Sequence, residues 1–168
     1  MQTQPSLIAV DMDGTFLTDA KTFDTERFSA ILDRLDARGI RFVVASGNTY
    51  AKLQDYMRGF ENRGLIYIAE NGAYLADDSG QLAVHPFREE DVPAIYEVLD
   101  GLKQIGLLVC TTEGIFLPKD RREQIVHVIR NYFEDTGQSI PDTLTLEDFA
   151  GFFFPGAILV DSIEEARG

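Results

Sequence analysis

Two aspartates, Asp11 and Asp13, stand where an apolar run at residues 7–10 ends, and Gly14 and Thr15 follow them directly. Side chains two residues apart on a strand lie on the same face. Where the strand ends, a glycine lets the chain turn, so that both carboxylates can still border one pocket. A carboxylate beside a divalent cation can attack phosphorus, and a second acid can protonate the leaving oxygen and later activate water. The pair therefore predicts phosphoryl transfer through an aspartyl-phosphate.

The elements that must position these acids alternate between strands and helices. Residues 7–10, 40–45 and 65–69 are apolar runs, and the first has the unbroken pattern of a strand buried on both faces of a parallel sheet. Two amphipathic helices are expected between them, the first capped by Asp24 or Thr25. Their apolar positions are Phe28, Ile31, Leu32 and Leu35, then Tyr50, Leu53, Met57 and Phe60. The alternation predicts an α/β fold with a Rossmann-like parallel sheet.

Polar residues follow each predicted strand. The second strand leads into 46–48 (SGN) and the third into 70–72 (ENG). In an open parallel sheet, ligands bind beyond the carboxyl ends of the strands, so these segments and the two aspartates should meet at one site. Main-chain N–H groups at Asp13 and Gly14, with Ser46 and Gly47, are expected to receive phosphate oxygens. Mg²⁺ suits such an all-oxygen site and offsets repulsion between carboxylate and phosphate.

A second module is expected after the third strand. Short runs at 74–76 and 82–84 flank Asp-Asp-Ser-Gly, which predicts a hairpin. Further on, helices are expected around 92–102 and 125–132, strands at 107–111 and 114–117, and a strand-like stretch at 152–160 that Pro155 and Gly156 interrupt. We therefore divide the chain into a core at 1–81 and an α+β module at 82–168.

Composition argues against several classes of function. The 168 residues carry 15 Lys plus Arg against 28 Asp plus Glu, a formal net charge of −13, which repels nucleic acid and anionic membrane surfaces. Cys110 is the only cysteine, so no internal disulfide can form. The sequence has no signal-peptide pattern and no apolar stretch of the about 20 residues that a spanning helix needs. It predicts a cytoplasmic protein.

Three motifs together resemble one family. The run 11–17 (DMDGTFL) is similar to the DxDGTxL signature of haloacid dehalogenase (HAD)-type phosphatases, and 45–48 (ASGN) to their second motif, a Ser or Thr after the second strand. The stretch 70–73 (ENGA) resembles the Cof-type branch (subfamily IIB), which includes sugar phosphatases and carries an α+β cap after the third strand. The resemblance is strong over 6–76 and weaker beyond. It implies a HAD-like core with an inserted cap.

The resemblance also implies roles for the matching residues. Asp11 becomes the nucleophile and a metal ligand. Asp13 becomes the general acid/base, with its main-chain carbonyl also on the Mg²⁺ ion. Ser46, the Gly47 backbone and Gly14 would bind the substrate phosphate.

Two further residues are assigned to the substrate side by the same resemblance. Asn48 stands where many relatives have Arg, so a contact there would be neutral. Asn71 would orient its loop or touch the substrate. The implied reaction is Mg²⁺-dependent hydrolysis of a small phosphorylated metabolite, with sugar phosphates as the expected class.

Two family elements have no match in the sequence. One is a Lys that neutralises the phosphorylated Asp, and the other is a Gly-Asp-x-x-x-Asp loop that completes the metal site; Lys103 and Lys119 lie in the cap region. We therefore expect a truncated gene product, a fragment, or one part of a split protein that alone lacks full phosphatase activity. The first strand, expected to be central, would then expose an apolar edge, which favours self-association or completion of the sheet by a missing C-terminal part.

Two other functions stay open beside the leading phosphatase hypothesis. A receiver-like phospho-acceptor module also uses acids and Mg²⁺ on a parallel sheet, but it needs an Asp after the third strand, where this chain has Glu70 and Asn71. A non-catalytic remnant that binds a ligand or a partner subunit fits the absent motifs.

Overall fold

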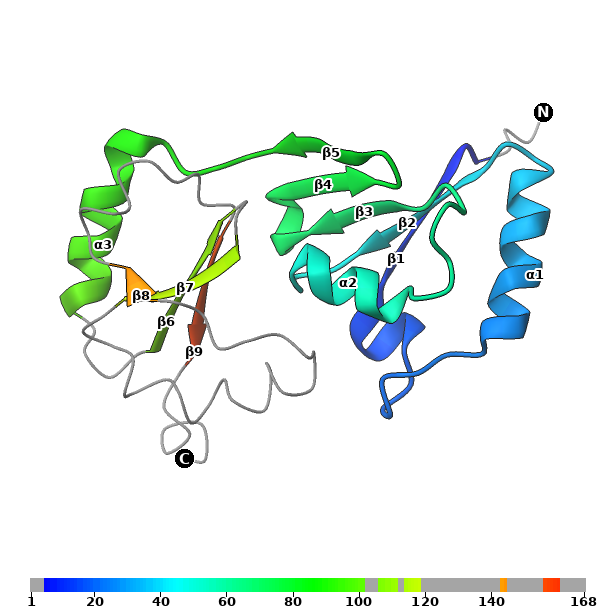
Figure 1. Cartoon of the computed structure of the whole chain (residues 1–168), viewed down its shortest axis with the longest axis horizontal. Coiled ribbons are helices and arrows are strands. Elements are labelled where there is room, and N and C mark those ends of the chain that lie inside the picture. The colour runs from blue at the N-terminus through cyan, green and yellow to red at the C-terminus, as the bar shows by residue number, and fades with distance from the viewer. Residues whose placement is uncertain (1–4, 102–105, 112–113, 119–142, 145–155, 161–168) are drawn as a thin grey trace. The chain divides into compact units, whose positions relative to one another are not determined.

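The structure is a computed structural model that describes residues 5–101, 106–111, 114–118, 143–144 and 156–160. The chain forms two compact units, Met1–His85 and Pro86–Gly168, and each is described by itself (Figure 1). The division expected after residue 81 would cut through strand β5 (Gly80–Val84), which pairs with β4 (Tyr74–Asp77). Because this pairing holds the hairpin to its sheet, the first unit extends to His85.

A five-stranded sheet of order β1-β2-β3-β4-β5 forms the first unit. β1 (Leu7–Asp11), β2 (Arg41–Ala45) and β3 (Ile66–Ala69) run parallel, so their carboxyl ends meet at one edge. β4 and β5 are antiparallel and form the predicted hairpin. The prediction of an α/β fold is confirmed, and the sheet is mixed because the hairpin extends it.

Two helices connect the parallel strands, α1 (Thr25–Asp36) and α2 (Tyr50–Tyr56). The Asp24 side chain caps α1, since its Oδ1 accepts a hydrogen bond from the Arg27 N–H at 2.9 Å. This selects one of the two predicted capping residues.

Helix α2 ends at Tyr56, before the last two apolar positions of the predicted helix, Met57 and Phe60. Met57 is already outside helical geometry, and Gly59 has a φ of 91°, which turns the chain away from the helix axis. Met57 and Phe60 are nevertheless buried, because the loop after α2 folds back over the core. The apolar spacing therefore identified core residues correctly and the helix end wrongly.

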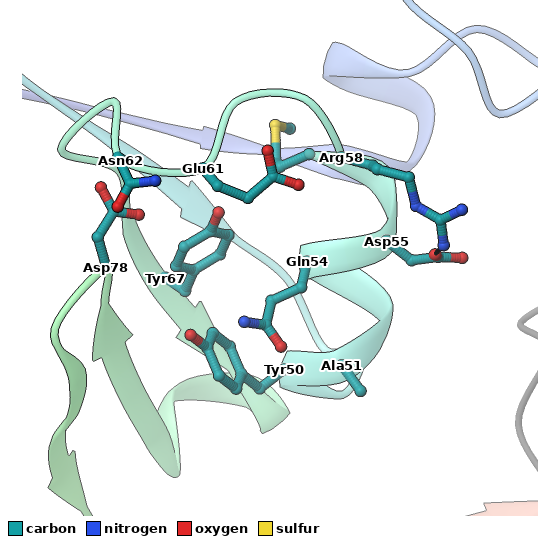
Figure 2. Close-up of a pocket in the computed structure, with 10 residues that line it drawn as sticks. Tyr50, Ala51, Gln54, Asp55, Arg58, Glu61, Asn62, Tyr67 and Asp78 are labelled. Carbon is teal, nitrogen blue, oxygen red and sulfur yellow. Dashed lines mark hydrogen bonds and ion pairs between the residues drawn. The ribbon is translucent and has the colours of Figure 1, made fainter.

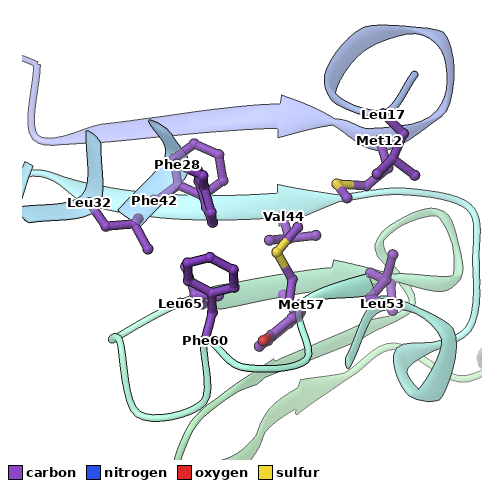
Figure 3. Packing of buried hydrophobic residues seen from close by; sticks show 12 residues of the cluster. Met12, Leu17, Phe28, Leu32, Phe42, Val44, Leu53, Met57, Phe60 and Leu65 are labelled. Carbon is purple, nitrogen blue, oxygen red and sulfur yellow. The ribbon is translucent and has the colours of Figure 1, made fainter. Parts of the chain in front are cut away.

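One hydrophobic cluster lies between the sheet and both helices (Figure 3). Phe42 and Val44 come from one face of β2, Phe28 and Leu32 from α1, and Leu53 from α2. Because both helices meet the same face of β2, they cover the same side of the sheet. Each such apolar side chain stabilises the fold by about 1.5–3 kcal/mol when it is fully buried.

Five phenylalanines form the part of this cluster nearest α1. The Phe28 ring centroid lies 5.0 Å from that of Phe16 and 4.9 Å from that of Phe60, in edge-on arrangements that aromatic quadrupoles favour. Phe23 and Phe42 complete the group. Since Phe16 and Phe23 stand on either side of the segment 17–22, the cluster fixes both ends of that segment.

Strand β1 is less buried than its apolar sequence predicts. Within the described residues it pairs with β2 alone and forms an edge of the sheet. Ile8 and Val10 pack against the core, whereas Ala9 is exposed and Leu7 is 48% exposed. The expectation of an exposed edge at this strand therefore agrees with the described sheet, whereas burial on both faces is not found, because α1 and α2 cover one face and β2 covers one edge.

The second unit contains a four-stranded sheet of order β8-β7-β6-β9. β6 (Gly106–Thr111) pairs antiparallel with β7 (Gly114–Pro118) and with β9 (Gly156–Val160), while β8 (Thr143–Leu144) pairs parallel with β7. The predicted strands at 107–111 and 114–117 are confirmed, and the strand-like stretch at 152–160 yields a strand that begins at Gly156. Cys110 is buried, as expected for an apolar strand.

Helix α3 (Val92–Gly101), preceded by a short turn at Glu89–Asp91, matches the predicted helix at 92–102. The helix expected around 125–132, the stretch 152–155, Lys103 and Lys119 lie outside the described residues. Among the described helices, none has the length and apolar character needed to cross a membrane.

The aromatic cluster gives a stability prediction. Phe28→Ala should lower the free energy of unfolding by about 3–5 kcal/mol, because it removes a ring that contacts aromatic partners on several elements. Ile31→Ala on the same helix is the control, since Ile31 is 38% exposed and should cost about 1 kcal/mol or less. Urea unfolding followed by NMR signals of residues 5–85 measures both. Equal losses in the two variants would contradict the packing described here.

Candidate active site

The turn after β1 exposes both aspartates. Met12 lies between them and is fully buried, and its main-chain carbonyl accepts a hydrogen bond from the Leu17 N–H at 2.9 Å. Gly14 has a φ of 72°, which glycine adopts without steric cost. Asp11 and Asp13 are exposed on either side of Met12. The buried methionine and the glycine turn thus hold two carboxylates at the surface, at the carboxyl end of β1.

Asp13 is held from two sides. Lys21 Nζ donates to one carboxylate oxygen at 2.5 Å, and Asn48 Nδ2 donates to the other at 2.7 Å. The hydrogen bond from Lys21 lowers the pKa of the Asp13 carboxyl below its usual range; partial burial opposes this, and the Asn48 hydrogen bond and the charges of Lys21 and Lys52 add to the lowering. Asp13 is therefore kept ionised and fixed in orientation.

Lys21 reaches Asp13 because a tight turn presents it. The Thr18 N–H donates to the Thr22 carbonyl and the Lys21 N–H to the Thr18 carbonyl, both at 2.9 Å. Lys21 itself has a φ of 56°, a left-handed conformation that is uncommon for a residue with a long side chain. The phenylalanine cluster anchors the chain before and after this turn. Sequence reasoning missed Lys21: a cation eight positions from an acid does not by itself reveal the left-handed turn that joins the two.

Hydrogen bonds join Ser46 to Asn48 within the segment 46–48, and join Asn48 to Asp13. Ser46 Oγ accepts hydrogen bonds from the Asn48 N–H at 3.1 Å and from Asn48 Nδ2 at 2.9 Å. Because Nδ2 carries two hydrogens, it can serve both Ser46 and Asp13. Both lone pairs of the Ser46 hydroxyl accept hydrogen bonds from Asn48, so the hydroxyl proton is available to donate to a ligand oxygen.

The third strand end is tied to the second by backbone hydrogen bonds. The Glu70 N–H donates to the Asn48 carbonyl at 3.0 Å, and the Asn71 N–H donates to the Ser46 carbonyl at 3.4 Å. Glu70 and Asn71 both have positive φ, of 51° and 56°. Asparagine reaches this region readily, whereas glutamate does so at a cost in strain.

At Gly47 a neighbouring side chain, rather than the backbone conformation, leaves little room for a Cβ atom. A Cβ atom at this position would lie 2.8 Å from the Asn71 Oδ1 atom. The Asn71 side chain therefore packs directly on the Gly47 main chain. Of the two roles predicted for Asn71, the contact fits that of orienting the loop.

The predicted site residues are brought together as follows. Asp13, Ser46 and Asn48 are joined by hydrogen bonds, and Gly47 and Asn71 by packing. Asp11 lies opposite Ala45 in the parallel register, one residue before Ser46, and Gly14 forms the turn. The described part of the chain contains no group of three or more metal-ligating side chains that could hold a metal ion.

The sequence is similar to those of known hydrolases. A family model for haloacid dehalogenase-like hydrolases matches residues 8–154. The 5-amino-6-(5-phospho-D-ribitylamino)uracil phosphatase YbjI of Escherichia coli (strain K12) is 32% identical over 157 residues, which cover 94% of this chain and 56% of that protein. The chain spans about half the length of the curated relatives it matches, 56% and 42% of two of them.

Solved structures give the same result at the level of the fold. SMU.1108c from Streptococcus mutans UA159 matches with a TM-score of 0.77 and 28% identity, over 98% of this chain and 60% of that chain. The HAD subclass IIB sugar phosphatase BT4131 matches with a TM-score of 0.66 and 17% identity, over 90% of this chain and 56% of that chain. The family model, which matches well over half of the sequence and includes the turn after β1, identifies the chain as a member of the haloacid dehalogenase-like hydrolase family.

Proposed function

We propose that this chain provides the nucleophile and the phosphate-binding loop of a phosphatase that acts on small phosphorylated metabolites. The observation that carries the proposal is the hydrogen-bonded series Lys21–Asp13–Asn48–Ser46 beside Asp11. The family match and a relative named as the phosphatase of a phosphorylated ribitylaminouracil support it. The relationship to a sugar phosphatase is one of fold.

In the first half-reaction, an Asp11 carboxylate oxygen attacks phosphorus and the bond from phosphorus to the leaving oxygen breaks. The product is an aspartyl-phosphate. Asp13 delivers a proton to the leaving oxygen from its minor protonated form, which the approach of the anionic substrate phosphate favours against the contacts from Lys21 and Asn48. In the second half, a water molecule gives its proton to Asp13 and attacks phosphorus, which frees Asp11 and releases inorganic phosphate. The contacts from Lys21 and Asn48 suit the second half, because they keep Asp13 ionised and aimed.

Phosphate binding falls to groups on the first two strand ends. The Ser46 hydroxyl has a proton to donate, since its lone pairs accept from Asn48. Main-chain N–H groups of Gly14 and Gly47 are the further proposed donors for phosphate oxygens. With a net charge of −13 over the chain, such local donors must offset the general repulsion of an anionic substrate.

Mg²⁺ is the proposed cofactor. The Asp11 carboxylate and the Asp13 main-chain carbonyl would hold it; both are oxygen ligands, and Mg²⁺ characteristically keeps several waters beside one or two carboxylates. The fit is consistent with the structure, because both Asp13 carboxylate oxygens are engaged and Asp11 is exposed. When bound, the ion would offset charge between Asp11 and the substrate phosphate.

A non-catalytic phosphate-binding module is the second candidate. The observation in its favour is that two acids, rather than three or more clustered ligands, are available for a metal among the described residues. Binding of a phosphate analogue without turnover would distinguish this candidate from an enzyme.

The role of Asp11 can be tested by substitution. Asp11→Asn should reduce hydrolysis of a generic phosphomonoester in the presence of Mg²⁺ by roughly 10³-fold or more, because an amide is a poor nucleophile. Glu26→Gln, at an exposed carboxylate on helix α1, is the control and should stay near the wild-type rate. Substantial turnover by Asp11→Asn would exclude Asp11 as the nucleophile.

The contact between Gly47 and Asn71 gives a second test. Gly47→Ala places a methyl group against the Asn71 side chain and should lower kcat/KM by roughly 10- to 100-fold, a loss of about 1.4–2.8 kcal/mol of transition-state binding. Asn71→Ala in the same chain makes room for the methyl group, so the double variant should recover part of the loss. A double variant as weak as the product of the two single effects would argue against this contact.

Lys21 provides a test with a pH readout. Its hydrogen bond lowers the pKa of Asp13, so Lys21→Met should raise that pKa and move the acidic limb of the pH–rate profile to higher pH. Lys21→Arg keeps a cationic donor and should retain a limb closer to that of the wild type. The sign follows because the step that needs ionised Asp13 is lost as pH falls through its pKa. An acidic limb at the same pH in Lys21→Met and the wild type would show that Lys21 does not act on the Asp13 carboxyl during the reaction.

A further inference from the structure

A pocket of about 450 Å³ lies in the first unit, lined by α2, the loop that follows it, β3 and the β4–β5 turn (Figure 2). None of the residues proposed for phosphate chemistry lines it. Its size is in the range of pockets that bind small molecules. The chemistry of its walls therefore has to be explained separately from that of the strand ends.

Tyr67 places a buried polar group in this pocket. Its side chain is 4% exposed, and the structure records no hydrogen bond of its hydroxyl to another described residue. Figure 2 shows the hydroxyl directed to the side of the pocket where Glu61 lies. Burial raises the pKa of the phenol, so the group stays protonated and offers one donor and two lone pairs. Buried polar groups are normally hydrogen-bonded, so this hydroxyl has unused capacity to bond to a molecule in the pocket, as donor or as acceptor.

Two carboxylates at the pocket are held in place by main-chain groups. Glu61 accepts from the Gly59 N–H with its two oxygens, at 3.0 and 2.9 Å, and Asp78 accepts from the Gly64 N–H at 2.7 Å. Neither carboxylate forms an ion pair with a cation among the described residues. Both retain lone pairs, so the pocket has two carboxylate acceptors that main-chain groups hold in place.

The other charges at the pocket do not reverse this sign. Arg58 also lines it, but its guanidinium forms an ion pair with Asp55, which lines the same pocket. The Gln54 amide adds a neutral polar group, and Figure 2 shows it beside the Tyr50 hydroxyl. The lining is therefore net acidic.

Aromatic surface completes the wall. The Tyr50 and Tyr67 rings lie 5.3 Å apart in an edge-on arrangement. Aromatic faces attract cations, and the carbons of the half-buried Tyr50 ring provide an apolar surface for an alkyl chain. A bare metal ion is a poorer match, because no cluster of three metal-ligating side chains occurs among the described residues.

We propose that this pocket binds a small organic cation, a primary ammonium group on a short alkyl chain. The ammonium N–H groups donate to Glu61, to Asp78 and to the Tyr67 hydroxyl oxygen, and the alkyl chain lies against the tyrosine rings. The site is separate from the aspartates at the strand ends, and its occupancy does not depend on the proposed phosphatase activity.

The test is an NMR titration of the ¹⁵N-labelled 168-residue chain with n-butylammonium chloride. Saturable shifts are expected at the amides of Gly59 and Gly64, which hold the two carboxylates. Uncharged 1-butanol, at matched ionic strength, should bind at least about tenfold more weakly because it lacks the charge.

Three variants locate the site. Tyr67→Phe, Glu61→Gln and Asp78→Asn should each weaken butylammonium binding by about five- to tenfold, the usual effect of losing one hydrogen bond or one charge partner. Tyr74→Phe and Glu26→Gln are the matched controls outside the pocket and should bind as the wild type does. Tyr67→Phe should also melt at the same or a higher temperature than the wild type without ligand, because it removes a buried hydroxyl that has no partner.

Three results would overturn the proposal: no saturable shift in the wild-type chain, equal binding of 1-butanol, or wild-type affinity in all three pocket variants. The amide spectrum of each variant reports whether it is folded. Should Tyr67→Phe fail to fold, the two carboxylate variants decide the outcome, since both residues are exposed.

Discussion

The side-chain amide of Asn48 donates two hydrogen bonds, and the geometry of the candidate active site depends on this pair. One bond goes to Ser46 on the same loop, and the other goes to Asp13 on the neighbouring strand end. Parallel pairing of β1 with β2 brings the two loops close, but it does not fix their side chains. The Asn48 amide fixes them, because one planar NH₂ group donates to both the proposed phosphate-binding hydroxyl and the proposed acid/base, and so sets how far apart they lie.

The conformational cost of this site falls on three residues near it. Lys21, Glu70 and Asn71 all have left-handed backbones, which cost of order 1–3 kcal/mol for residues other than glycine and less for asparagine. Hydrogen bonds and packing offset that cost. The turn at 18–22 is closed by main-chain bonds and anchored by the phenylalanine cluster, and the loop at 70–71 is held to 46–48 by its N–H groups. The left-handed backbone at Lys21 therefore accompanies its contact with Asp13, and the left-handed backbone at Asn71 accompanies its contact with Gly47.

Much of the first unit was readable from the sequence. Apolar runs with turn signals predicted the three parallel strands and the hairpin, and helical spacing with an aspartate cap predicted α1, because these features are local. The burial of β1 was misjudged, since a run such as 7–10 looks the same at the centre and at the edge of a sheet. The early end of α2 was missed because Met57 and Phe60 keep helical spacing while lying in a loop.

The site was predicted in part for the same reason. The motifs at 11–15 and 46–48 pointed to Asp11, Asp13 and Ser46, because strand ends of a parallel sheet converge. Lys21 could not be identified, since its reach to Asp13 depends on a left-handed turn that its sequence does not signal. The reason for Gly47 was equally hidden: its φ is ordinary, and the crowding of a larger residue comes from the end of the Asn71 side chain.

The central claim is that Asp11 takes a phosphoryl group, and a covalent trap tests it most directly. The chain is incubated with Mg²⁺ and a phosphomonoester, quenched in acid, reduced with borohydride and digested for peptide mass spectrometry. An acyl phosphate is reduced to an alcohol, so homoserine should appear at position 11 and should be absent without the phosphomonoester. Homoserine at position 13 or elsewhere, or an unmodified Asp11 while phosphate is released, would contradict the account.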